Sequence, residues 1–468
     1  MSYRGKEKAG SEIPLYHTAP GSDNRVGRFV FKPRASWKQL LSLQDAKVIG
    51  LIMGSWVILV HLVERTHVRY VINKCQWKNW ENWDKKTGIV PHRVALVADP
   101  QLVDDNSYPD RPDLLNYFVK KICDNYLRRN HRFLQRLLDP DSTIFLGDLF
   151  DGGRDWNDQL WFEEYERFTN IFPAQPHRIT IKSLPGNHDI GFQTIDPLRQ
   201  KRFERFFGPP NDVVTLGNHT VVLLDVISLS SESKDINRPP HEFLQSLPAT
   251  MEKNIPKILL THVPLYRDNQ QQTCGPKRES PNPFPVKKGK QYQTVVEHDL
   301  TSEILDTINP CLVFGGDDHD YCEISHQLSH GLSAKEITVK SVAMSAGIKH
   351  PALQLLSLHN PVDAEGQSLA ALPTYSTEMC YLPSPLAGIT LYVIWFSISI
   401  IVLGVNALYP NTIHKALSRF SKDPVSIYNS RVKDKVNSGS KDYKKLGITI
   451  CFTIFYVYLV IGLHYSYV

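Results

Sequence analysis

Three polar residues of different chemistry stand next to one another in the turn after a short apolar run. Asn187 carries an amide oxygen, His188 an imidazole and Asp189 a carboxylate. The proline and glycine just before them indicate a tight turn. Amide oxygens bind divalent cations, and an imidazole transfers protons near neutral pH. This turn is therefore a candidate site of catalysis.

Four more polar clusters directly follow short runs of β-type residues. They are Asp99 and Gln101, Asp148 and Asp151, His262 alone, and Asp317 and His319. In an open α/β sheet the carboxyl ends of the strands meet at one crevice, so clusters far apart in the sequence can lie together. A single Asp after a strand is more often a turn or N-cap residue, and the joint pattern is what favours a metal site. Oxygen and imidazole ligands without thiolates suit Mn²⁺, Mg²⁺, Fe²⁺ or Zn²⁺.

The five clusters together resemble the calcineurin-like metallophosphoesterases, whose pattern is D-x-H, G-D-x-x-D, G-N-H-D/E, a lone His and G-H-x-H. The resemblance covers roughly residues 90 to 325. Two positions depart from it, because Gln101 and Asp317 stand where the family has histidines. Both side chains still carry an oxygen, and replacing imidazole by oxygen favours a harder ion such as Mn²⁺ over zinc.

This resemblance implies two divalent cations that share the carboxylate of Asp148. The first set of expected ligands is Asp99, Gln101, Asp148 and His319, and the second is Asp148, Asn187, His262 and Asp317. Two such ions about 3.5–4 Å apart generate hydroxide near neutral pH and stabilise both oxygens of an in-line displacement.

The resemblance also implies roles for residues that do not bind metal. His188 would protonate the leaving alkoxide, a step that matters most for a sugar or alkyl alcohol. Asp151 would orient the His188 ring. Arg154 and Arg267 follow Asp151 and His262 closely enough to contact a phosphate, although single arginines are more often surface residues.

Three apolar segments have the length of membrane-spanning helices, namely residues 46–64, 386–408 and 446–464. The first lacks a cleavage signature and begins too far from Met1 for a simple signal peptide, so a retained helix is favoured. A buried core helix is the alternative. It fits the second segment poorly, because residues 389–405 contain no charge.

The charges next to these segments predict how the chain crosses the membrane. Residues 1–47 contain nine Lys and Arg against four acids, and residues 410–445 contain nine against three. The positive-inside rule therefore predicts a cytosolic, disordered tail at 1–45, a lumenal metallophosphoesterase domain at 66–385 and a cytosolic loop at 409–445.

Two further observations agree with a lumenal domain. Asn218 begins an N-glycosylation acceptor, Asn-His-Thr. Six of the seven cysteines lie in residues 66–385, an even number that could pair in an oxidising compartment. Their connectivity stays open, and buried free thiols are the alternative for Cys123 and Cys311.

The expected fold is α/β, a two-sheet β-sandwich flanked by helices with metals at the strand ends, plus transmembrane helices. Apolar periodicity predicts helices over 112–138 and 156–170, and residues 213–226 indicate a hairpin. Residues 268–293 suggest a mobile loop over the site, with simple surface disorder as the alternative. The tryptophans of 77–83 suggest a membrane-interface belt, with packing against the domain as the alternative.

A finer resemblance concerns residues 98–109 and 317–323, together with a membrane span on each side of the domain. These features are similar to the lumenal metallophosphoesterases of fungi and animals that remodel GPI anchors. That resemblance implies a Mn²⁺ enzyme of the endoplasmic reticulum or early Golgi. It would hydrolyse the phosphodiester between ethanolamine phosphate and a mannose of GPI-anchored proteins or GPI glycolipid.

Two other functions remain open at this point. One is a lumenal phosphoesterase that acts on lipid, nucleotide or pyrophosphate-linked substrates, and the other is a membrane scaffold of weak catalytic power. No nucleic-acid signature is present, because membrane topology already accounts for the basic segments.

Overall fold

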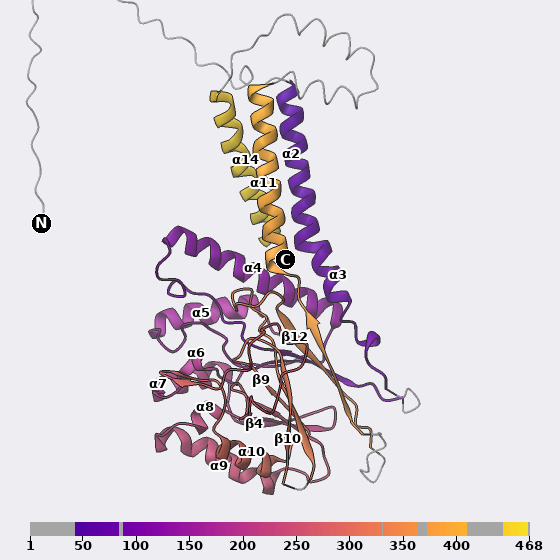
Figure 1. The fold of residues 1–468 in the computed structure, drawn as a ribbon, viewed down its shortest axis with the longest axis vertical. Coiled ribbons are helices and arrows are strands. Elements are labelled where there is room, and N and C mark those ends of the chain that lie inside the picture. Colours follow the sequence, from indigo (N-terminus) through magenta and orange to yellow (C-terminus); the bar gives the residue numbers. More distant parts are fainter. Residues whose placement is uncertain (1–42, 84–87, 330, 363–371, 410–442, 467–468) are drawn as a thin grey trace, which may run out of the picture.

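The computed structural model describes residues 43–83, 88–329, 331–362, 372–409 and 443–466. They form a column of three long helices above an α/β domain (Figure 1). The predicted cytosolic tail and the predicted cytosolic loop lie almost entirely outside the described residues.

Each helix of the column is long and apolar enough to cross a membrane. The first begins as α2 (Leu43–His61) and continues through a π-helical turn, η1 (Leu62–His67), into α3 (Val68–Asn73). The others are α11 (Pro385–Leu408) and α14 (Tyr443–Ser466). The first helix extends beyond the predicted 46–64 because Val68 and Ile72 pack into the domain core.

Polar contacts join the three helices within the column. The Trp56 indole donates to Ser399 Oγ at 3.1 Å, which links α2 to α11. At the opposite end from the domain, Asp45 Oδ1 accepts from Asn406 of α11 at 2.7 Å and pairs with Lys445 of α14 at 2.6 Å. The column is therefore a bundle held by side chains of all three helices.

The domain contains two main sheets that face each other. The first has the order β13-β12-β1-β2-β3, and the second β10-β11-β9-β6-β5-β4. The strands of the first are β1 (His92–Val97), β2 (Ser142–Phe145), β3 (Ile179–Ile181), β12 (Ala352–Leu358) and β13 (Tyr375–Tyr381). Those of the second are β4 (Asp212–Leu216), β5 (His219–Leu223), β6 (Lys257–Leu260), β9 (Leu312–Gly315), β10 (Cys322–Gln327) and β11 (Ser333–Thr338).

Alternation along the strands builds two cores. Val94 and Leu96 of β1 pack between the sheets with Leu260 of β6, whereas Ala95 and Val97 join the core that includes the helices. This period of two follows from side chains that point to opposite faces of a strand. The flanking helices are α4 (Asp113–Leu138), α5 (Asp158–Ile171), α7 (Pro197–Phe207), α8 (Val226–Leu229), α9 (Lys234–Thr250) and α10 (His298–Ile308). The predicted two-sheet α/β fold is confirmed.

The two predicted helices and the hairpin are observed close to their expected bounds. They correspond to α4, α5 and the antiparallel pair β4–β5, in which Leu216 faces His219. The tryptophans of 77–83 pack against the domain, which was the alternative to a membrane-interface belt. Trp77 donates to the Leu138 carbonyl at 2.6 Å, and Trp83 donates to Ser357 Oγ at 2.8 Å.

Two disulfides tie distant parts of the domain together. Cys75 pairs with Cys380, which joins the segment after α3 to β13, and Cys274 pairs with Cys322. Cys123 and Cys311 are free thiols. The Cys274–Cys322 disulfide and the small ladder of β7 (Lys288–Gly289) with β8 (Tyr292–Gln293) hold the segment 268–293 in place. We had expected a mobile loop here, and the structure shows a loop fastened at both points.

Candidate metal centre

The predicted metal-binding residues lie together where strands of both sheets end. β1 leads to Asp99, β2 to Asp148, β6 to His262, and β9 to Asp317 and His319. β1 runs parallel to β2, and β6 runs parallel to β9, so each pair ends at one edge. Asn187 begins the short helix α6 (Asn187–Ile190).

The acidic and imidazole groups form two clusters that share Asp148. Ligand atoms of Asp99, Asp148 and His319 lie within 4.8 Å of one another, as do those of Asp148, His262 and Asp317. Two clusters with one common carboxylate are the arrangement expected for two cations with a bridging ligand.

Three buried atoms at this place lack hydrogen-bond partners. They are Asp99 Oδ2, Asn187 Oδ1 and His262 Nε2. A buried polar group without a partner is costly, so several at one point call for a bound ion or water. All three have lone pairs that can bind a divalent cation, and the residues therefore fit the implied metal pair.

A hydrogen bond from its other ring nitrogen fixes the orientation of the His262 ring. Its Nδ1 lies 2.7 Å from the carbonyl oxygen of Leu146, which accepts the ring proton. Nε2 is then the free nitrogen, 3.4 Å from Asp148 Oδ1 and 3.6 Å from Asp317 Oδ1. A hydrogen bond from the distal nitrogen is the usual way in which a protein orients a metal-binding histidine.

The backbone at the site is bent into an uncommon conformation. Positive φ angles occur at Asp99 (48°), Gln101 (38°), Asp148 (49°), Asp317 (68°) and His319 (65°). Such angles are rare for residues other than glycine and cluster at functional sites, where they direct side chains. The backbone N–H of Gln101 donates to the Asp148 carbonyl at 2.9 Å, which places Gln101 against the shared ligand.

Glycines allow the loops to approach this closely. A Cβ on Gly186 would lie 2.0 Å from Asp148 Oδ1, and one on Gly147 would lie 2.5 Å from His262 Nδ1. Gly147 also has φ of +92°. A side chain at either position would therefore push apart residues predicted to bind metal.

His188 lies beside the clusters with one ring nitrogen already engaged. Its Nδ1 is 2.6 Å from the Asp151 carbonyl oxygen and 3.3 Å from Asp151 Oδ1. Its backbone N–H donates to Asp148 Oδ1 at 2.9 Å. Only Nε2 remains for a substrate, as a general acid requires. Asp151 in turn accepts a short hydrogen bond from Ser107 Oγ.

The charges shift the ionisation of these groups in a consistent way. Burial alone would lower the pKa of His188, but Asp148 and Asp151 outweigh it and raise that pKa to about 9. Burial, and then Asp148, raise the pKa of Asp317 to about 7 despite the attraction of His262. Burial lowers the pKa of His319, which keeps its imidazole neutral and able to bind a metal.

Two carboxylates support the site in ways that were not predicted from the sequence, although Asp189 belongs to the turn singled out there. Asp189 Oδ2 accepts the N–H of Gly186 at 2.8 Å, and Asp104 Oδ1 lies 2.9 Å from Ser107 Oγ. Asp104 Oδ2 also accepts the Trp156 indole N–H at 2.9 Å. The polar run 104–107 directly after the first cluster was the available signal for this chain of contacts.

The two arginines predicted to contact a substrate differ in their exposure and in their distance from the clusters. Arg154 Nη1 donates to the Asn187 carbonyl at 3.2 Å, next to the clusters, and its side chain is partly exposed. Arg267 is buried and pairs with Glu336 at 2.6 Å. The prediction for Arg267 is wrong, because Glu336 neutralises this guanidinium inside the domain and no surface is left for a substrate.

Asn218 lies in the turn between β4 and β5. Its Nδ2 donates to the Asn360 carbonyl at 3.0 Å, which uses one of its two hydrogens and leaves the other position for a glycan. Glycosylation at this residue stays a prediction.

A cavity of about 660 Å³ opens beside His319. Its walls include Arg278, Lys349 and His350. Arg278 is paired with Asp318, whereas the His350 side chain is 56% exposed. Glu279, Asp318 and Asp320 line the same cavity, and Glu279 lies 3.3 Å from His350, so the wall beside His319 is mixed in charge.

Comparisons with known proteins agree with this geometry. The family model for calcineurin-like phosphoesterases matches residues 92–321. Cell division control protein 1 of Saccharomyces cerevisiae is 50% identical over 356 residues, 74% of this chain and 72% of that protein. Metallophosphoesterase 1 of Xenopus laevis is 26% identical over 373 residues, 74% of this chain and 85% of that protein. The Metallophosphoesterase 1 homolog of Caenorhabditis elegans is 29% identical over 268 residues, 56% of this chain and 68% of that protein.

Proposed function

The chain belongs to the calcineurin-like phosphoesterase family and is a metal-dependent phosphoester hydrolase, and we propose that its substrate is a GPI glycan. In this proposal it hydrolyses the phosphodiester between ethanolamine phosphate and a mannose. A water oxygen bonds to phosphorus, the bond between phosphorus and the mannose oxygen breaks, and that oxygen takes a proton, so the products are ethanolamine phosphate and the free mannose hydroxyl. The domain would act in the lumen of the endoplasmic reticulum or early Golgi.

The arrangement of His188 is the observation that favours a sugar phosphodiester as the substrate. A mannose alkoxide is a poor leaving group, so its departure needs a proton. Asp151 engages Nδ1 of His188 and holds the ring in its protonated form, which leaves the Nε2 proton for the departing oxygen. A substrate with a phenol or phosphate leaving group would need this acid far less.

The remaining residues have roles that follow from their contacts. Asp99, Gln101, Asp148 and His319 would hold one cation, and Asp148, Asn187, His262 and Asp317 the other. When bound, the pair supplies a hydroxide near neutral pH and positive charge for the phosphoryl oxygens, and Mn²⁺ best matches a ligand set rich in oxygen. Arg154 lies where it can contact a phosphate oxygen.

The membrane arrangement supports a lumenal substrate. Two disulfides in the domain favour an oxidising compartment. Basic residues concentrate in the tail and in the segment between α11 and α14, and the positive-inside rule assigns both to the cytosol. A GPI glycan projects from the lumenal leaflet, so an enzyme held in the same membrane meets it at a high effective concentration.

The test uses the purified full-length chain with Mn²⁺ and a GPI glycan that carries ethanolamine phosphate on one mannose. We expect release of ethanolamine phosphate, detected by mass spectrometry, and two metal ions per chain. Asp148→Asn should lose both, while the exposed control Asp299→Asn should keep both. Cells depleted of the protein should retain ethanolamine phosphate on that mannose.

Two results would overturn the proposal in different ways. Turnover of a generic phosphodiester with no action on the glycan would leave a metallophosphoesterase with another lipid or nucleotide substrate. Fewer than two ions per chain and no turnover of any phosphodiester would favour the membrane scaffold.

A further inference from the structure

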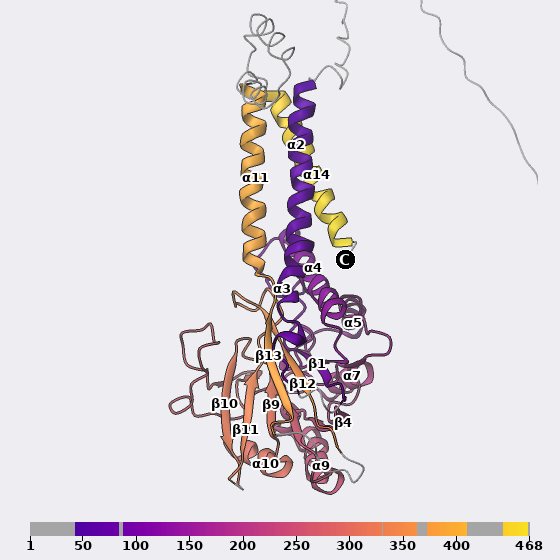
Figure 2. The same ribbon diagram turned by 90° about the vertical axis from the view of Figure 1, so that its right-hand side faces the viewer.

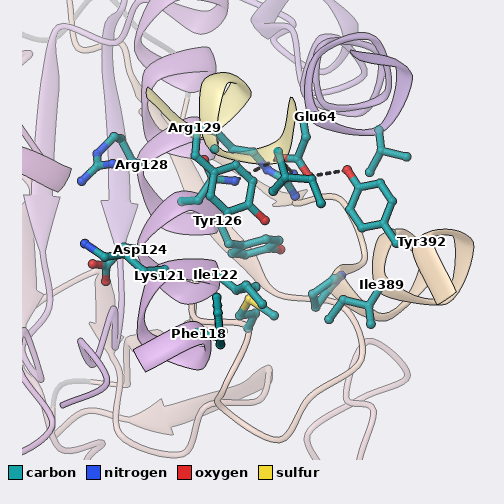
Figure 3. Close-up of a pocket in the computed structure, with 18 of the residues that line it drawn as sticks. Glu64, Phe118, Lys121, Ile122, Asp124, Tyr126, Arg128, Arg129, Ile389 and Tyr392 are labelled. Atoms are coloured by element: carbon teal, nitrogen blue, oxygen red, sulfur yellow. Dashed lines mark hydrogen bonds and ion pairs between the residues drawn. The ribbon is translucent and has the colours of Figure 1, made fainter. Parts of the chain in front are cut away.

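A cavity of about 550 Å³ lies where the catalytic domain meets the column of long helices. Its size is that of ligand pockets in proteins, which hold about 300–1,000 Å³. Figure 3 shows α4 on one side and the start of α11 on the other. Its apolar lining comes from α4 and all three long helices and includes Phe118, Ile122 and Tyr126 of α4, Val63 of η1, Ile389 and Tyr392 of α11, and Tyr458 of α14.

This cavity opens toward surface that a membrane would cover. Two of its walls, α11 and α14, are apolar enough to cross a bilayer. Val393 and Tyr458, which line the cavity, are 60% and 57% exposed on these helices. An apolar space that continues into an apolar exposed surface is suited to hydrocarbon rather than to a water-soluble ligand.

Helix α4 has the features of a helix at a membrane surface, and it lies beside this cavity. It lies across the base of the column (Figure 1 and Figure 2). Its first turns expose Leu114 (70%), Leu115 (48%) and Tyr117 (49%). Apolar and aromatic side chains on a helix that also carries Lys and Arg are typical of helices at a membrane surface.

The charges around the cavity are divided into a neutral wall and a cationic edge. Glu64 is buried and pairs with Arg129, and its carboxylate also accepts from Asn125 at 3.0 Å and Tyr392 at 2.8 Å. Figure 3 shows this group at one end of the cavity. The charge of Glu64 is therefore neutralised by Arg129 within the wall.

Lys121 and Arg128 also line the cavity, and they differ from their neighbours on α4. Lys120 pairs with Glu164 at 2.9 Å, and Arg129 pairs with Glu64. Within the described part of the chain, neither Lys121 nor Arg128 forms an ion pair. The carboxylate of Asp124, which also lines the cavity, is paired with Arg167. Two cations without an ion-pair partner, beside an apolar space, complement an anionic phosphate.

We propose that this cavity binds one acyl chain of an anionic glycerophospholipid from the bilayer, with the lipid phosphate at Lys121 and Arg128. The lipid would fill the space between α4 and the column and so join the domain to the membrane. This inference is independent of the substrate proposed above, since it rests only on the helices and α4.

The test measures lipid bound to the purified full-length protein. Delipidated protein in detergent is offered phosphatidylglycerol or phosphatidylcholine, and bound lipid is counted by native mass spectrometry. We expect one phosphatidylglycerol per chain and at least tenfold less phosphatidylcholine. Equal retention of the two lipids would overturn the role given to Lys121 and Arg128.

One variant with a matched control tests the cavity itself. Gly462 lines the cavity, and a Cβ there would meet no atom within 4 Å, so Gly462→Phe should fill the space and lower bound lipid at least tenfold. Gly447 of the same helix also has nothing within 4 Å but does not line the cavity, so Gly447→Phe should bind like the wild type. Wild-type lipid binding by Gly462→Phe would contradict the proposal.

Charge reversal provides a variant that leaves the core untouched. Lys121→Glu with Arg128→Glu should abolish the preference for phosphatidylglycerol. Lys201→Glu with Arg205→Glu, on exposed positions of α7, should keep it. A third arm offers a lipid-linked glycan, and binding of this molecule alone would mean that the cavity holds the substrate's lipid instead of a bilayer lipid. Hydrolysis of a soluble phosphodiester by all variants separates these outcomes from a failure of the catalytic proposal.

Discussion

Asp189 Oδ1 accepts the backbone N–H of Phe150 at 3.0 Å, which joins the loop of Asp148 to the turn of Asn187. The other oxygen, Oδ2, accepts the N–H of Leu149 at 3.2 Å and that of Gly186 at 2.8 Å. One buried carboxylate therefore satisfies three backbone donors from two segments that carry predicted metal ligands.

Asp189→Asn should destabilise the protein and weaken metal binding. In either orientation the amide places an N–H group against backbone donors, and leaving a buried donor unsatisfied costs about 1–3 kcal/mol. Denaturant unfolding and metal analysis measure the two effects. The exposed Asp299→Asn serves as control, and unchanged metal content in Asp189→Asn would contradict the positioning role.

His188→Ala should lower kcat for a sugar phosphodiester by about 10²- to 10⁴-fold, the usual contribution of a general acid, and leave metal content nearly unchanged. The loss should be much smaller with a nitrophenyl phosphodiester, because that leaving group needs no proton. Equal losses with both substrates would argue against His188 as the acid.

The rate should fall as pH rises through the pKa of His188. The raised pKa of about 9 keeps the ring protonated below that pH, and nearby cations lower it, so the falling limb should lie at or below about pH 9. Asp151→Asn removes a negative charge but keeps the carbonyl that accepts from Nδ1. It should move the limb to lower pH, as a pH–rate profile would show, and an unmoved limb would contradict this coupling.

Metal removal should reverse how stability depends on pH. Without cations, burial raises the pKa of Asp317 to about 7, and the carboxylates around His262 raise the pKa of its ring although burial opposes this. Both groups bind protons more tightly when folded, so their contribution to stability is lost as pH rises from about 4 through 7 and above.

Cation binding requires a carboxylate and a neutral imidazole, and it therefore releases protons and strengthens with pH. We expect the thermal midpoint to fall from about pH 5 to 8 in chelator and to rise over the same range with Mn²⁺. Parallel curves in the two conditions would contradict a metal site at these residues.

Arg267→Ala should unfold the protein more easily without raising KM. It leaves Glu336 buried without its guanidinium partner, and breaking a buried ion pair costs about 3–5 kcal/mol. Arg154→Ala should show the opposite behaviour, a higher KM at nearly unchanged stability, because that side chain is partly exposed beside Asn187. Thermal unfolding and steady-state kinetics of both variants distinguish the two roles.

The sequence by itself predicted the fold class, the helices α4 and α5, and the Asp and His residues that the structure gathers into two clusters able to hold a metal ion. These features are local, since helical periodicity, strand length and the polar residue after a strand can be read within a few positions. Parallel strands bring such endings to one edge, so five short motifs were enough to define the centre.

Only the tertiary structure decided the partners of single side chains. Arg267 and Glu336 are far apart in the sequence and meet through β11, and Cys75 reaches Cys380 across 305 residues. Nothing local distinguishes Arg267 from Arg154, or Lys121 from Lys120, because their roles depend on which carboxylate lies within reach after folding. Local patterns therefore determined which groups the chain brings to the candidate metal centre, and packing of distant segments determined which of the other charges are neutralised and which remain available to a ligand.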